Sequence, residues 1–155
     1  MRFENKKEII KPGNQTNFNG LDLYKRLYRA KEYIDDCYDK PIDLNRIAKQ
    51  AYFSPFHFLR EFKKIYNKTP HQYLTERRIE KAKELLSNDS FRVTDVCFEV
   101  GFQSVGSFST LFNKYVGYPP AVYKLEYLRK LQVAIRFPEK VIPACFLQIY
   151  RLSQA

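Results

Sequence analysis

The sequence predicts an all-α fold in which two copies of a short two-helix motif are joined by a longer helix. Three observations predict this fold class. Apolar residues recur at helical spacing, small residues interrupt them where a tight turn and a new helix would lie, and the whole pattern occurs twice. Hydrophobic residues make up 45% of the 155 positions, which is enough to build a core.

The clearest copy of the motif spans residues 93–116. Gly101 permits a tight turn because a glycine adopts a left-handed backbone without steric cost, and Ser104 is suited to cap the helix that follows. Two short helices joined by such a turn form a helix-turn-helix. The inward sides of its two helices are expected to carry Val93, Val96, Cys97 and Val100, then Phe108, Leu111, Phe112 and Tyr115.

The same pattern occurs earlier in the chain, in residues 43–66. Residues 44–53 match residues 49 positions further on, and from Ser54 onward the offset is 50, so that Phe58 matches Phe108 and Phe62 matches Phe112. One inserted residue in the second turn accounts for the change of offset, since loops accept insertions. Asn67 stands where Gly117 stands, and Asn is the next best left-handed residue.

The remaining elements follow from the same signals. Residues 1–19 are polar and predict a flexible N-terminal arm, followed by an amphipathic helix over about 21–38. Thr69, Pro70 and Gln72 resemble a capping box, with proline at the first helical position, and predict a linker helix over 70–87. Such a helix is about 27 Å long, close to the ~34 Å between successive major-groove faces on one side of DNA.

The last part of the chain predicts a helix followed by a tail of different character. Pro119 and Pro120 open a helix that is expected to end near Leu131. Residues 132–155 are rich in apolar and alternating positions, which predicts a short β-hairpin. We expect this C-terminal tail to pack on the domain formed by residues 20–131, with pairing to a partner or a second copy as the alternative.

Several motifs carry a resemblance to a known family. They are Phe-Leu-Arg-Glu-Phe-Lys-Lys (58–64), Thr-Pro-His-Gln-Tyr-Leu (69–74), Val-Gly-Phe (100–102) and Pro-Pro-Ala-Val-Tyr (119–123). Through them the chain closely resembles the AraC/XylS family of bacterial transcription regulators over about residues 21–123. The resemblance implies a sequence-specific regulator that inserts two recognition helices, 55–66 and 105–116, into consecutive major grooves of double-stranded DNA.

The outward positions of the two recognition helices are the expected DNA contacts. Arg60 is the strongest single candidate, because its planar guanidinium matches the O6 and N7 acceptors of guanine. Thr110 stands at the equivalent position, where family members often have Arg, and predicts weaker readout. For Phe56 and Leu59 the alternative is packing on a neighbouring helix. We expect base contacts from Phe56, Leu59, Arg60, Lys63, Val105, Gly106, Ser109, Thr110 and Asn113, and phosphate contacts from Ser54, Lys64, Lys68, Ser104 and Lys114.

The net charge of +10 favours a polyanionic partner, because counterions released from DNA contribute to affinity. RNA polymerase is a second partner compatible with this function. A monomer is favoured, and a dimer through the C-terminal tail is the alternative. Neither a membrane span nor an export signal is present in the sequence, and the three cysteines lack metal-ligand spacing. We therefore expect a cytoplasmic protein without metal or cofactor.

Two other functions are alternatives to DNA binding. An enzyme is disfavoured because both histidines, His57 and His71, fall within the repeated motif and its linker, and no catalytic residue is expected. The apolar surroundings of Cys145 favour a small buried residue over a methyl acceptor. The second rival is a protein-interaction module that keeps the fold without reading DNA. Only about 20 residues precede the first helix, so the chain either lacks the family's usual ligand-binding domain or is a fragment of a longer regulator.

Overall fold

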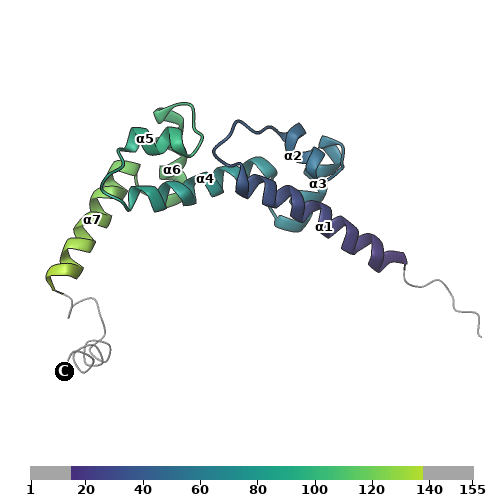
Figure 1. The fold of residues 1–155 in the computed structure, drawn as a ribbon, viewed down its shortest axis with the longest axis horizontal. Helices are drawn as coiled ribbons and strands as arrows, with labels where there is room; N and C mark the ends of the chain where they lie inside the picture. The colour runs from purple at the N-terminus through teal and green to yellow at the C-terminus, as the bar shows by residue number, and fades with distance from the viewer. Residues whose placement is uncertain (1–14, 138–155) are drawn as a thin grey trace, which may run out of the picture. The chain divides into compact units, whose positions relative to one another are not determined.

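The computed structural model describes residues 15–137, and within this range the protein is all-α, which confirms the predicted fold class (Figure 1). The chain divides into two compact units. The described part of unit 1 comprises residues 15–36 and 42–70, and that of unit 2 comprises 37–41 and 71–137. The helices are α1 (Gln15–Asp36), α2 (Leu44–Gln50), α3 (Pro55–Tyr66), α4 (Pro70–Leu86), α5 (Val93–Glu99), α6 (Val105–Val116) and α7 (Pro120–Arg136).

In unit 1, α1 packs against both α2 and α3. The Asp43 carboxylate accepts a hydrogen bond from the backbone N–H of Arg46 (2.7 Å), which starts α2. Ser54 caps α3, and Asn67 ends it in the left-handed conformation (φ 56°), as the repeat predicts. The buried side chains that hold the three helices together include Leu27, Ala30, Ile34, Ile47, Ala48, Phe58 and Phe62.

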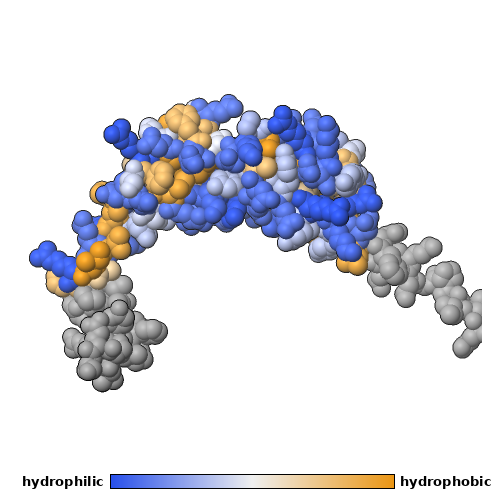
Figure 2. All heavy atoms as spheres, in the orientation of Figure 1, coloured by the Kyte–Doolittle hydropathy of each residue, from blue (hydrophilic) through white to orange (hydrophobic). Residues whose placement is uncertain are grey.

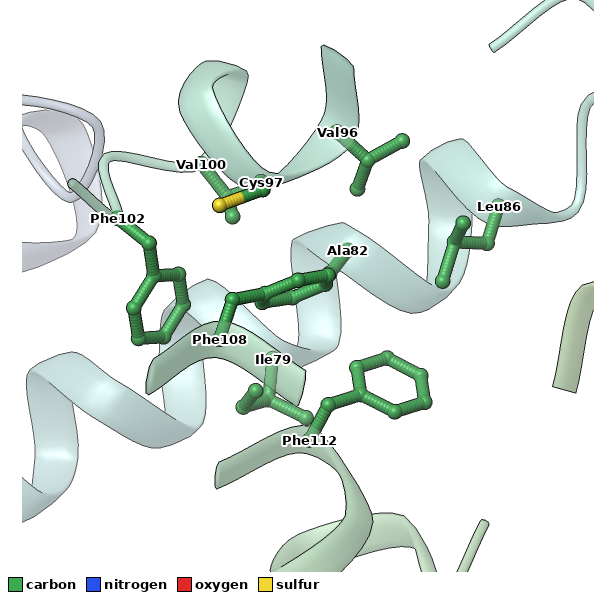
Figure 3. Close-up of a cluster of buried hydrophobic side chains, with 9 residues drawn as sticks. All are labelled: Ile79, Ala82, Leu86, Val96, Cys97, Val100, Phe102, Phe108 and Phe112. Carbon is green, nitrogen blue, oxygen red and sulfur yellow. The ribbon is translucent and has the colours of Figure 1, made fainter. Parts of the chain in front are cut away.

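Unit 2 is built around a second core, to which α4, α5 and α6 all contribute (Figure 3). The rings of Phe108 and Phe112 lie 5.6 Å apart, close to the 5.3 Å between Phe58 and Phe62 in unit 1. The spacing of two aromatic residues on one helix face is therefore preserved between the copies. The buried residues of this core are Ile79, Ala82, Leu86, Val96, Cys97, Val100, Phe102, Phe108 and Phe112.

Both helix-turn-helix turns contain a residue with a left-handed backbone. In unit 2 this residue is Gly101 (φ 87°), and a Cβ atom added there would lie 2.5 Å from the carbonyl oxygen of Asp39. The matching position in unit 1 is Tyr52 (φ 54°), a residue type for which this conformation is uncommon. A glycine is therefore required at position 101 for two reasons: its left-handed backbone and the close approach of residue 39.

Two basic side chains hold loops of unit 2 in place by donating hydrogen bonds to backbone carbonyl oxygens. Arg78 on α4 donates to the carbonyl oxygens of Tyr38 (2.7 Å) and Lys40 (3.0 Å). Burial lowers the pKa of its guanidinium, against the opposing effect of the Asp39 carboxylate. Lys124 on α7 likewise donates to the carbonyl oxygens of Asp89 (2.8 Å) and Phe91 (2.7 Å). Helix α4 therefore holds the segment that precedes α2, and helix α7 holds the segment that precedes α5.

The structure corrects the predicted boundaries at both ends. Helix α1 already begins at Gln15, so residues 15–19 are helical and not part of a flexible arm. Helix α7 continues to Arg136, so Val133 and Ile135 are helical and do not belong to a strand. Their short alternation was too brief to define a period, and Pro138 is the first residue that cannot continue the helix. The rest of the predicted arm and hairpin lies outside the described residues.

Candidate nucleic-acid interface

Helix α3 presents one continuous polar and aromatic face on the side opposite its buried phenylalanines. At 100° per residue, Phe56, Arg60, Lys63 and Lys64 fall within about 120° of the helix circumference, and all four are exposed. Phe56 is 78% exposed, so its ring does not pack on a neighbouring helix of the described chain. An aromatic group and three cations thus share one face that is free to meet a ligand.

The ion pair between Arg60 and Glu61 positions the Arg60 guanidinium. Its Nε donates to the Glu61 carboxylate (3.1 Å), and His57 Nε2 lies 3.7 Å from the same carboxylate oxygen. The side chain of Glu61 is only 12% exposed, whereas that of Arg60 is 65% exposed. The ion pair engages Nε, and a bidentate contact with guanine can use the two terminal nitrogens. The carboxylate therefore orients the guanidinium without covering it.

Helix α6 presents the matching face with different chemistry. Gly106, Thr110, Asn113 and Lys114 are exposed and occupy the positions of Phe56, Arg60, Lys63 and Lys64. The Thr110 hydroxyl donates to the carbonyl oxygen of Gly106 one turn earlier (3.0 Å). Its proton is therefore already used within the helix. Lys114 is the only basic side chain on α6, so this face is small and nearly uncharged.

Some predicted contacts lie at the edge of these faces. Leu59 and Ser109, which match each other in the repeat, are both half-buried. Val105 is also half-buried and packs against the unit 2 core. Lys68 is half-buried beyond the end of α3. The structure thus brings together four of the predicted residues on each recognition helix and places these four at the margin.

The two serines predicted to contact phosphate are helix caps. Ser54 Oγ accepts from the backbone N–H of His57 (3.4 Å), and Ser104 Oγ accepts from that of Ser107 (3.2 Å). Both serines are exposed at a helix N-terminus, where backbone N–H groups and the helix dipole favour an anion. The Ser54 hydroxyl can therefore donate to a phosphate while it caps α3. The Ser104 hydroxyl instead donates to Ser107 Oγ (2.9 Å), so an anion at α6 would meet mainly the backbone N–H groups.

Two exposed residues in the first turn of the recognition helices were missing from the predicted set. His57 and Ser107 are separated by the repeat offset of 50, and both follow the capping serine by three positions. First-turn residues of a recognition helix commonly contact base edges. The offset itself was the signal that could have found them, because both members of the pair are polar.

The described residues contain no group of three His, Cys, Asp or Glu side chains placed to hold a metal ion. Cys97 lies within the unit 2 core, where burial raises the pKa of its thiol. A protonated thiol in such surroundings is a poor nucleophile. None of the helices between residues 15 and 137 has the length and apolar character needed to cross a membrane.

Comparisons with known proteins agree with this geometry. A helix-turn-helix domain family matches residues 47–126. The chain is 32% identical over 120 residues to the HTH-type transcriptional regulator YdeC of Bacillus subtilis, covering 76% of this chain and 41% of YdeC. It is 33% identical over 93 residues to the bifunctional transcriptional activator/DNA repair enzyme AdaA of Bacillus subtilis, covering 60% of this chain and 44% of AdaA.

A solved structure of a DNA-binding domain also has a similar fold. The DNA-binding domain of AdpA, a global transcriptional factor solved in complex with a target DNA, superposes with a TM-score of 0.58 at 25% identity, over 76% of this chain and 97% of that domain. The present chain spans less than half the length of the two curated relatives described above. From the matched family and the doubled helix-turn-helix, we conclude that the chain belongs to the AraC-type helix-turn-helix family of transcriptional regulators.

Proposed function

We propose that the protein regulates transcription by binding asymmetric DNA as a monomer, with α3 and α6 in consecutive major grooves. The observation that supports this best is the common design of the two helices. Each starts at a capping serine, buries a pair of phenylalanines and exposes the opposite side. A recognition helix needs this arrangement, because one side must anchor it while the other enters the groove.

Base readout is assigned mainly to unit 1. Arg60 would donate to guanine, Phe56 would contact thymine methyl groups, and Lys63 would add a cationic contact. In unit 2, Gly106, Thr110 and Asn113 would allow close approach with few hydrogen bonds. Leu59, Val105 and Ser109 would contribute from the edges of the two faces. Phosphate contacts are assigned to Ser54, Lys64, Lys68, Ser104 and Lys114.

We also infer that the protein acts in the cytoplasm. A transcription regulator acts where the chromosome lies, which in bacteria is the cytoplasm. This role requires neither a cofactor nor a catalytic residue. The buried thiol of Cys97, a poor nucleophile, is consistent with a function that is not catalytic. RNA polymerase is a partner consistent with this role. One chain can read an asymmetric DNA site, because the chain contains two different recognition helices.

Selection of bound sites from a random duplex library, followed by salt titration, tests this function. With ~6–8 phosphates neutralised, log K should fall against log salt with a slope of roughly −5 to −7 on the selected site. A scrambled duplex of equal length is the control and should bind at least about 1,000-fold more weakly. A slope shallower than about −2, or no enriched sequence, would instead indicate a protein-interaction module.

A further inference from the structure

A groove in unit 2 lies outside the proposed DNA interface. It is lined by α4, by the C-terminal end of α6 and by α7, and its volume is about 740 Å³. We call it the α4–α7 groove. Its apolar lining includes four large side chains that remain well exposed, and α7 as a whole shows several exposed apolar residues (Figure 2). The four are Tyr115, Tyr118, Val122 and Tyr127.

The charges of the groove differ from those of the chain. Glu76, Glu80 and Glu126 line it together with Lys83 and Lys130, although the whole protein carries +10, and Glu80 and Glu126 are ion-paired with the neighbouring Arg77 and Arg129. Carboxylates repel DNA phosphates, and the base-facing residues of α6 do not line this groove. The groove therefore suits an apolar segment better than it suits nucleic acid.

We propose that residues 141–150 of the same chain occupy the α4–α7 groove. This segment, Val-Ile-Pro-Ala-Cys-Phe-Leu-Gln-Ile-Tyr, contains no charged residue. Lys140 and Arg151 flank it on either side. Left in water, such a segment would expose a large apolar surface. The groove has an exposed apolar face, and a segment of this composition is suited to cover it.

The length of the chain allows this contact. Helix α7 ends at Arg136, and Pro138 prevents its continuation, so the chain can reverse within residues 138–140. From Phe137 back to Val122 is 15 residues of helix, or about 22 Å. Ten extended residues span up to about 33 Å. Residues 141–150 can therefore reach the whole groove by running back along α7.

Occupation by a second copy is disfavoured by two features. A segment separated by only four residues from the end of α7 has an effective concentration in the millimolar range, far above that of a separate chain. Two chains of net charge +10 also repel each other. An intramolecular contact is therefore favoured over the same contact between molecules.

Ending the chain after Phe137 tests the proposal when combined with a matched pair of substitutions. Val122 lines the groove and Val133 does not, yet both lie on α7 and both are 42% exposed. We expect Val122→Gln to lower the melting temperature of the full chain by about 4 °C or more and to have little effect on the shortened chain. Val133→Gln should have the same small effect in both. The shortened chain should melt lower than the full chain with unchanged solution mass.

Three outcomes would overturn the proposal. If shortening converts a dimer into a monomer, the groove is filled by a second copy. An equal effect of Val122→Gln in both chains means that Val122 only supports the fold. Unchanged melting after shortening means that the segment contacts nothing. Should the shortened chain not fold, Phe146→Gln in the full chain replaces it, and DNA affinity, which none of these changes should alter, reports that the variants are intact.

Discussion

The two helix-turn-helix regions share the pattern of their buried residues and differ at almost all of their outward positions. Residues 43–66 carry five basic and two acidic side chains, a net charge of +3, whereas residues 93–116 carry one basic and two acidic, a net charge of −1. Their recognition helices have identical lengths, equivalent serine caps and left-handed ends. The comparison shows that the two motifs share their buried pattern, serine caps and left-handed ends, while the outward positions of the recognition helices differ and are free to set what each helix binds.

The largest expected effects should be equal in the two regions, because the cores are equivalent. Phe62→Ala and Phe112→Ala should each cost ~3–5 kcal/mol of folding free energy, through lost burial and a cavity. Amide hydrogen exchange during urea unfolding can follow each unit separately. A cost below about 1 kcal/mol for either variant would contradict the equivalence of the two cores.

Substitution in the two turns should affect stability to very different extents. Gly101→Ala should destabilise unit 2 by at least ~2 kcal/mol, because it adds a left-handed cost and a contact with the Asp39 carbonyl. Tyr52→Gly should change the stability of unit 1 by less than ~1 kcal/mol, since relief of the left-handed cost is offset by greater freedom of the unfolded chain. Thermal unfolding checks both. A well-tolerated Gly101→Ala would mean that residues 37–41 do not pack on the turn.

The equivalent positions Arg60 and Thr110 should separate the two regions in DNA binding. Arg60→Ala should weaken binding to a selected site by ~1–3 kcal/mol and relax the preference at one base pair. Thr110→Ala should cost clearly less, because its hydroxyl already bonds to Gly106. Binding isotherms on the selected site and on single-base variants measure both. A larger loss for Thr110→Ala would place the dominant readout in unit 2.

The smallest expected effects concern the second residue of each recognition helix. Phe56→Ala should leave folding stability within ~0.5 kcal/mol of the parent, because the ring is exposed, while weakening DNA binding. Gly106→Ala meets no neighbouring atom and should stabilise α6 by up to ~1 kcal/mol. Melting and DNA affinity are measured for both. A strong loss of stability in Phe56→Ala would make this residue part of the core.

The repeat carried most of what could be predicted from the sequence. It located both recognition helices, both serine caps and the left-handed ends at Asn67 and Gly117. It also matched Tyr52 with Gly101, yet a left-handed tyrosine was not expected, because residue type argues against it. The pairing of repeat positions was here a better guide to backbone conformation than residue preference.

Long-range contacts could not be predicted. The bonds from Arg78 to Tyr38 and Lys40 join residues about 40 positions apart, and carbonyl acceptors leave no trace in a sequence because every residue has one. The same holds for Lys124. The half-burial of Leu59 and Ser109 depends on where neighbouring helices pass, and periodicity along one helix does not determine this.

The separation of buried and exposed sides on α3 and α6 has a consequence for how such a protein can change over generations. After a duplication, substitutions at Phe58, Phe62, Phe108 or Phe112 are purged because they unfold the motif. Substitutions at the exposed positions leave the fold intact, so the two copies can acquire separate sequence preferences one residue at a time. A chain of this kind can gain a new target site through unit 2 while unit 1 keeps it attached to the old one.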